Sequence, residues 1–167
     1  MPSVRRFQSH EWQLYRDLRL AALRDAPDAF GSTLAREEAF SEQEWIARLA
    51  AGAGSPLDHP IVAEDDAGNA VGLAWARIEP ADVHTAKLYQ VWIHPDARRQ
   101  HIGAELLASA IRWAKEAGAH AIELHVALGP DSAFAFYKRA GFVVSGECSP
   151  LRPGSERLQQ PMRLVIG

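Results

Sequence analysis

The stretch that decides the fold is residues 91–104, which read Val-Trp-Ile-His-Pro-Asp-Ala-Arg-Arg-Gln-His-Ile-Gly-Ala. It joins a strand that ends at Pro95 to the most regular amphipathic helix of the chain, through the basic turn Arg98–His101. The first turn of a helix carries unpaired N–H groups and about half a positive charge, which suits phosphate or pyrophosphate. Gly103 would let such a ligand approach the backbone. A solvated turn that only connects strand to helix is the alternative interpretation.

On both sides of this junction, hydrophobic periodicity predicts further strands and helices. Strands are expected at Val4–Phe7, Ile61–Glu64, Ala70–Ile78, Thr85–His94, Ala121–Ala127, Phe142–Glu147 and Leu158–Ile166. Helices are expected at Trp12–Ala26, Ser41–Ala51, Ile102–Gly118 and Ser132–Ala140. The order βααβββαβαββ indicates an α/β (α+β) chain, and the short turns between its first three long strands predict antiparallel pairing there.

Local signals refine this assignment at several points. Ser9 is a candidate cap for the first helix, and Ser41 begins a capping-box pattern at the second. The turn-rich segment Asp25–Thr33 is expected to be a loop, and Asp65–Asn69 a hairpin turn. Pro161 lacks a backbone donor, so we expect it at a sheet edge or a bulge.

Length and composition favour one soluble domain spanning residues 1–167. A net charge of −3 argues against nucleic acid as the main partner, because no basic excess is available to neutralise phosphates. No apolar run approaches the roughly 18 residues of a membrane span, and the N-terminus lacks a secretion signal. We therefore expect no membrane partner and a cytoplasmic location.

The familiar sequence motifs of several other enzyme classes are absent. The chain has no phosphate-binding P-loop, no nucleophile elbow and no His-Glu-x-x-His pattern, and its histidines lack metal-ligand spacing. Cys148 is the only cysteine, which excludes an internal disulfide and a cysteine zinc cluster. We expect no metal.

The junction resembles motif A of the GNAT superfamily, the acetyl-CoA-dependent N-acetyltransferases. In that family Val-x-Pro-x-x-Arg precedes a glycine-rich turn ending in Gly-x-Gly, and a helix with paired leucines follows. This chain matches the pattern at Ile93, Pro95, Arg98, Gly103, Leu106 and Leu107. It departs from the pattern at His101, which stands where the family has the first glycine of Gly-x-Gly.

Two further segments resemble the same family in the same order. Ala133–Phe142 is similar to the family's Ala-x-x-x-Tyr-x-x-x-Gly-Phe segment, and Arg19–Ser32 is similar to the opening of many bacterial members. Pro130 replaces an asparagine that often precedes the tyrosine segment. The resemblance covers nearly the whole chain and implies a GNAT-like mixed, mostly antiparallel twisted sheet flanked by about four helices.

The resemblance also implies roles in binding acetyl-CoA as cosubstrate. Val91, Trp92 and Ile93 would offer backbone groups to the pantetheine and the acetyl carbonyl. The following turn would hold the pyrophosphate through Arg98, Arg99, Gln100, His101, Ile102, Gly103 and Ala104. Tyr137 matches the family's general acid for the departing thiolate; a packed aromatic with a wet hydroxyl is the alternative interpretation.

The general base is not assigned by the sequence. Many family members carry a glutamate on the strand before motif A, whereas Lys87–Gln90 contains no carboxylate. Candidates elsewhere in the chain are Glu37, Glu38, Glu64, His84 and His125. Each of them can equally be a solvated or structural residue, and a base acting through water is a further alternative.

The acceptor is expected to be a primary amine on a small molecule or a peptide. Phe30, Tyr89 and Trp92 are expected to form an aromatic wall on the acceptor side, with Phe30 and Tyr89 as the candidate substrate-binding residues; core and surface positions are the alternative interpretation. The net charge of −3 favours a cationic amine, which Glu37 or Glu38 could attract. A homodimer is compatible with the resemblance. The alternative function is a non-catalytic acyl-CoA-binding or regulatory domain.

Overall fold

The computed structural model describes all of residues 1–167 and contains one mixed sheet of eight strands. The strands are β1 (Ser3–Arg6), β2 (Asp58–Glu64), β3 (Ala70–Ile78), β4 (Thr85–Ile93), β5 (Ala121–Ala127), β6 (Val143–Val144), β7 (Ser149–Pro150) and β8 (Leu158–Val165). Paired neighbours follow the order β1-β2-β3-β4-β5-β8-β6, and β7 also pairs with β8. Only β4 and β5 run parallel. The predicted mixed, mostly antiparallel sheet is confirmed.

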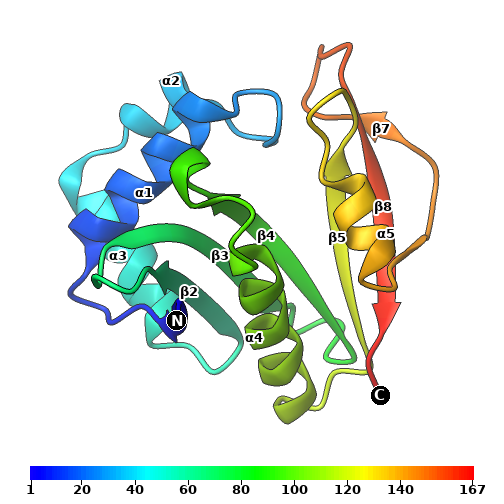
Figure 1. The fold of residues 1–167 in the computed structure, drawn as a ribbon, viewed down its shortest axis with the longest axis horizontal. Helices are drawn as coiled ribbons and strands as arrows, with labels where there is room; N and C mark the ends of the chain where they lie inside the picture. The colour runs from blue at the N-terminus through cyan, green and yellow to red at the C-terminus, as the bar shows by residue number, and fades with distance from the viewer.

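Helices cover the two faces of this sheet. They are α1 (Trp12–Asp25), α2 (Leu34–Glu38), α3 (Glu42–Ala53), α4 (Ile102–Glu116) and α5 (Phe134–Arg139). Figure 1 shows α4 crossing in front of β3 and β4, with α1, α2 and α3 gathered on the other side. The buried apolar residues accordingly form two clusters, one around Leu106 of α4 and one around Trp45 of α3. The sheet therefore separates two cores.

The helix boundaries confirm one predicted cap and contradict another. At α3 the Ser41 hydroxyl accepts a hydrogen bond from the Glu44 N–H at 3.2 Å, as the capping-box pattern predicts. The cap position of α1 is Glu11, which makes no side-chain cap bond, so the prediction of Ser9 as the cap is wrong. A fifth, short helix, α2, was not expected; the Thr33 hydroxyl caps it by accepting from the Arg36 N–H.

The C-terminal part of the sheet is more fragmented than predicted. Instead of one strand over Phe142–Glu147 the chain forms the two-residue strands β6 and β7, separated by residues 145–148. Phe142 precedes β6 and is buried in the core on the α4 side. The interruption faces Pro161 of β8, whose carbonyl accepts from the Ser145 N–H while its own nitrogen has nothing to donate. Pro161 therefore lies where the neighbouring strand is broken, although β8 itself is not an edge strand.

Two features of β4 make room for a site at its carboxyl end. β4 and β5 are in register only over Thr85–Lys87, so the rest of β4 has no strand partner on that side. β4 also carries an extra residue opposite Ala74, and Gln90 there adopts a left-handed φ of 61°. Such a bulge bends and twists the strand locally, which accounts for its departure from β5. In Figure 1 the two strands diverge toward this end.

Candidate active site

The loop between β4 and α4 presents a row of backbone donors. Arg99 and His101 both adopt left-handed φ angles, 66° and 63°, on either side of Gln100. The six backbone N–H groups from Arg99 to Ala104 donate to no protein group. The next N–H group, that of Glu105, donates to the His101 carbonyl and begins the hydrogen bonds of α4. Consecutive N–H groups of this kind, together with the positive end of a helix dipole, make an anion-binding concavity.

The two arginines of this loop have different surroundings. Arg98 turns back, donating through Nε to the Ile93 carbonyl at 3.0 Å and through Nη2 to Asp25 Oδ2 at 2.6 Å. Asp25 also accepts from the Trp92 indole at 2.9 Å, so it fastens β4 and the loop to the end of α1. Arg99 is exposed and has no hydrogen bond or ion pair. The charge of Arg98 is thus already balanced, and that of Arg99 is available to an anion.

The first turn of α4 also packs against α5, the helix that carries Tyr137. An added Cβ at Gly103 would lie 3.5 Å from Cζ of Phe136 and 3.4 Å from Cδ1 of Ile93. Phe136 in turn makes an edge-on contact with the Tyr137 ring, at 5.2 Å between centroids. The structure therefore brings three expected site segments together: the end of β4, the β4–α4 loop and the helix that carries Tyr137.

Tyr137 is 6% exposed and its hydroxyl makes no hydrogen bond with the protein. Its ring is packed edge-on between Phe136 and Phe142. Burial raises the pKa of this phenol above its ordinary value of 10, because the charged phenolate would be poorly solvated. The group therefore keeps its proton at neutral pH and remains a donor.

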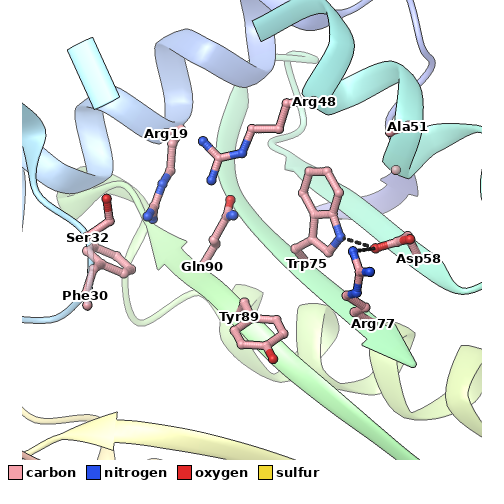
Figure 2. A pocket seen from close by; sticks show the side chains of 12 residues that line it. Arg19, Phe30, Ser32, Arg48, Ala51, Asp58, Trp75, Arg77, Tyr89 and Gln90 are labelled. Atoms are coloured by element: carbon pink, nitrogen blue, oxygen red, sulfur yellow. Dashed lines mark hydrogen bonds and ion pairs between the residues drawn. The ribbon is translucent and has the colours of Figure 1, made fainter. Parts of the chain in front are cut away.

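A cavity of about 530 Å³ opens on the other face of the sheet, beside the bulge of β4. Aromatic, charged and polar residues from α1, the loop after it, α3, β2, β3 and β4 line it. Among them are Arg19, Phe30, Arg48, Asp58, Trp75, Arg77, Tyr89 and Gln90. Figure 2 shows the guanidinium group of Arg48 pointing toward the side chain of Gln90, and that of Arg19 lies over the Phe30 ring, 4.9 Å from its centroid. Phe30 and Tyr89, the two predicted substrate-binding residues, both line this cavity.

Beneath the cavity, two arginines share one buried carboxylate. Glu37 Oε1 accepts from Arg19 Nε at 3.0 Å and from Arg48 Nη1 at 2.9 Å, and Oε2 accepts from Arg19 Nη2 at 2.8 Å. Burial alone would raise the pKa of this carboxyl, but Arg19, Ser32 and Arg48 lower it to about 2. Glu37 is therefore fully ionised and holds both arginines in place.

This arrangement overturns two expectations for Glu37. A carboxylate with a pKa of about 2 that already accepts three hydrogen bonds is a poor base for an amine. It is also poorly placed to attract a cationic acceptor, because its charge is paired with Arg19 and Arg48, which line the cavity, whereas Glu37 does not. The net charge of the whole chain was a wrong guide to the charge of this cavity.

None of the other candidate bases lines the cavity. Glu64 accepts from Arg5 at 2.8 Å, and His84 stacks on His120. Glu38 and His125 are exposed, the latter on β5 opposite Pro161.

No cluster of three or more potential metal-ligating side chains occurs. No helix has both the length and the apolar character that crossing a bilayer requires.

Comparison with known proteins gives this architecture a family. The model of the acetyltransferase (GNAT) family matches residues 13–142, which include α1, the β4–α4 junction and Tyr137. The chain belongs to this family.

A mycothiol acetyltransferase of Propionibacterium freudenreichii is 33% identical over 85 residues, which is 50% of this chain and 27% of that protein. The chain thus spans about a quarter of that relative's length.

Two solved structures show the same fold over nearly the whole chain. An acetyltransferase of the GNAT family from Streptococcus pneumoniae has a TM-score of 0.80 at 21% identity, with 100% of each chain covered. A GNAT superfamily phosphinothricin acetyltransferase from Sinorhizobium meliloti, in complex with acetyl-CoA, has a TM-score of 0.80 at 18% identity. That match covers 99% of this chain and 89% of the other.

Sequence reasoning missed the charged residues of the cavity, although one signal was present. Arg19 lies on the buried stripe of α1, between Leu18 and Ala22, where an apolar residue is the rule. A charged residue on such a stripe must have a buried partner or a function. Arg48 and Gln90 gave no comparable signal.

Proposed function

We propose that this protein is an N-acetyltransferase that transfers the acetyl group of acetyl-CoA to a primary amine by direct attack. The observation that carries the proposal is the row of unpartnered backbone N–H groups from Arg99 to Ala104. It follows directly after the edge of β4 that β5 leaves free. A diphosphate bound at the loop and an extended arm along the strand edge would satisfy both sets of backbone groups.

The residues present fit acetyl-CoA in this position. The pyrophosphate would be held by the backbone of Arg99–Ala104 and by the side chain of Arg99. Arg98 would position the loop from behind, through its bonds to Asp25 and the Ile93 carbonyl. Val91, Trp92 and Ile93 would meet the pantetheine with their backbone only, since the Trp92 side chain is buried in the core on the opposite face.

Acetyl-CoA would supply a thioester carbonyl that a neutral amine can attack, with a thiolate as the leaving group. Tyr137 would give its proton to that thiolate, because its phenol stays protonated and its hydroxyl has no competing protein partner. No side chain is assigned as the base, and a water at the cavity would take the amine proton.

The two departures from the family pattern affect the cofactor site. His101 caps α4 in a left-handed conformation that glycine adopts without strain, so its side chain is tolerated rather than required. Pro130 lies in the exposed turn between β5 and α5 and contributes no N–H donor. Neither change removes the N–H groups of the loop.

The test uses Gly103→Asp. The structure has room for a Cβ at Gly103, and an acidic residue in the first turn suits the helix dipole, so the variant should fold. Its carboxylate would repel a pyrophosphate at the same place. We expect wild-type melting temperature to rise with acetyl-CoA concentration and that of the variant to stay constant. Ala108→Asp, which adds the same charge at an exposed position farther along α4, is the control and should respond like the wild type.

Calorimetry of acetyl-CoA binding and release of free CoA over a panel of amines complete the test. Equal acetyl-CoA affinity of the wild type and Gly103→Asp would contradict the proposed site. Acetyl-CoA binding without amine-dependent CoA release would instead support the alternative, a non-catalytic acyl-CoA-binding domain. That alternative rests on the departures at His101 and Pro130 and on the absence of an assigned base.

A further inference from the structure

Arg19 has a buried donor that nothing in the protein satisfies. The residue is 3% exposed, and its Nε and Nη2 both donate to Glu37. Its remaining nitrogen, Nη1, is fully buried and has no partner. An unpaired buried guanidinium donor is costly, so a group that accepts from it gains binding energy. Arg19 lines the cavity, and its guanidinium points into it (Figure 2).

Other donors converge on the same place. Arg48 uses only Nη1 to reach Glu37, which leaves its Nε and Nη2 without a protein partner. Gln90 accepts from the Tyr15 hydroxyl through Oε1 at 2.8 Å, and its Nε2 donates to no protein group. Three side chains that line the same cavity, from α1, α3 and β4, thus each carry unpaired N–H groups. No acceptor of this chain completes them.

The local charge is also unbalanced. Arg19 and Arg48 share the single carboxylate of Glu37, which leaves one positive charge uncompensated. Arg77, the third arginine of the cavity, is paired separately, with Asp58 at 3.6 Å and with Glu79 at 3.0 Å. In a partly enclosed cavity with aromatic walls, one uncompensated guanidinium attracts an anion strongly.

We propose that the acceptor amine also carries an anionic oxygen group, a carboxylate or a phosphonate, which binds Arg19 Nη1, Arg48 and Gln90. The inference rests on the proposed acetyl transfer and names the class of its acceptor. Gln90 immediately precedes Val91–Ile93 on β4, where the thioester is expected. An acceptor whose anionic group binds at Gln90 would therefore lie beside the end of β4 where the reacting carbonyl is expected.

The test compares amines that differ only in the anion. L-Amino acids are titrated calorimetrically beside their primary amides, and aminoalkylphosphonates beside the corresponding alkylamines. At least one anionic member should bind about tenfold or more tightly than its neutral partner, the usual effect of a charge-assisted hydrogen bond. If no anionic member is preferred, the inference is wrong, whether or not any amine is acetylated.

Single-residue variants test which side chains produce the preference for the anionic amine. Arg48→Gln should reduce the preference for the anionic amine about tenfold, because it removes one positive charge from the proposed site. The variant should fold, because the Arg48 side chain is 30% exposed and Glu37 keeps both hydrogen bonds from Arg19. Arg19→Lys keeps the charge but loses the forked donors, and should also reduce the preference. Arg16→Gln removes a charge from the exposed side of α1 and should leave it unchanged. Thermal unfolding checks that each variant is folded, and full preference in Arg48→Gln would overturn the inference.

CoA release with the same amines separates this inference from the proposed function. An anionic preference in binding without CoA release supports the anion site and contradicts acetyl transfer. Faster CoA release with the neutral partners supports acetyl transfer and contradicts the anion site.

Discussion

Tyr137 is a buried residue whose hydroxyl has no hydrogen-bond partner in the protein. Tyr137→Phe therefore removes no protein hydrogen bond and keeps the ring packing against Phe142. If the phenol protonates the thiolate as it leaves, the loss is confined to the transition state. We expect turnover to fall about 10²-fold or more, with little change in acetyl-CoA affinity or melting temperature. CoA release and calorimetry measure the two effects, and wild-type turnover in the variant would exclude Tyr137 as the acid.

His101→Gly is a comparison variant for Tyr137→Phe. Its left-handed backbone costs a non-glycine residue about 1 kcal/mol or more, so the glycine variant should be somewhat more stable. It should alter acetyl-CoA affinity first and the chemical step second, which is the opposite of the pattern expected for Tyr137→Phe. An effect on turnover alone would remove His101 from the cofactor site.

Among the elements, α3 and β3 meet at an unusually close contact. A Cβ added at Gly52 would lie 2.1 Å from Cζ2 of Trp75, well inside van der Waals distance. The indole cannot easily move, because its Nε1 donates to the buried Asp58 carboxylate at 2.8 Å. This contact sets the distance between helix and sheet and forms one wall of the cavity. A helical glycine is usually unfavourable, so its presence here reflects packing.

We therefore expect Gly52→Ala to destabilise the protein by roughly 1–3 kcal/mol, the usual cost of overpacking. The sign of this change in the free energy of unfolding distinguishes packing from helix propensity, since helix propensity alone would make the alanine variant more stable by about 1 kcal/mol. Urea unfolding at equilibrium measures the difference. In a Trp75→Leu background the same substitution should cost less, because the colliding ring is gone. An equal cost in both backgrounds would contradict the contact.

For the whole molecule, the joining of α4 to the sheet depends on a neutral histidine. The ring of His59 on β2 stacks on Trp113 of α4 at 5.3 Å, and its Nε2 lies 3.1 Å from Ser109 Oγ. Burial, helped by the positive charges of Arg6 and Arg112, lowers the pKa of His59 to about 4. The unfolded chain therefore binds a proton at higher pH than the folded one.

The consequence is a loss of stability on acidification. The unfolded state takes up this proton below about pH 6.5 and the folded state only near pH 4, so unfolding is favoured progressively between these values. We expect the urea midpoint to fall between about pH 7 and about pH 5, and His59→Gln to reduce that fall. His125→Gln, which removes an exposed histidine, is the control and should keep it. An identical pH dependence in wild type and His59→Gln would contradict the assignment.

Much of the fold follows from local sequence. The bounds of β3 and β5 agree with those predicted, because a continuous apolar run, as in β3, and an alternating one, as in β5, are both properties of neighbouring positions. The same holds for the start of α4 and its loop, whose N–H groups are free simply because a helix begins there. The resemblance in Ala133–Phe142 likewise made Tyr137 the candidate acid without any knowledge of its packing, and that role stays a prediction. By contrast, the short α2 and the split of β6 from β7 escaped periodicity, since neither is long enough to show a period.

Only the tertiary structure decided which residues line the proposed acceptor cavity. Arg19, Glu37 and Arg48 come from three different helices, and Gln90 reaches them from a bulge of β4. Their meeting depends on how the helices pack on the sheet, which no local pattern encodes. The net charge of −3, an average over the whole chain, pointed to a cationic acceptor, while the packed cavity gathers an excess of guanidinium groups. Electrostatic attraction falls with distance and solvent screening, so the charges that line a cavity outweigh those spread over the surface.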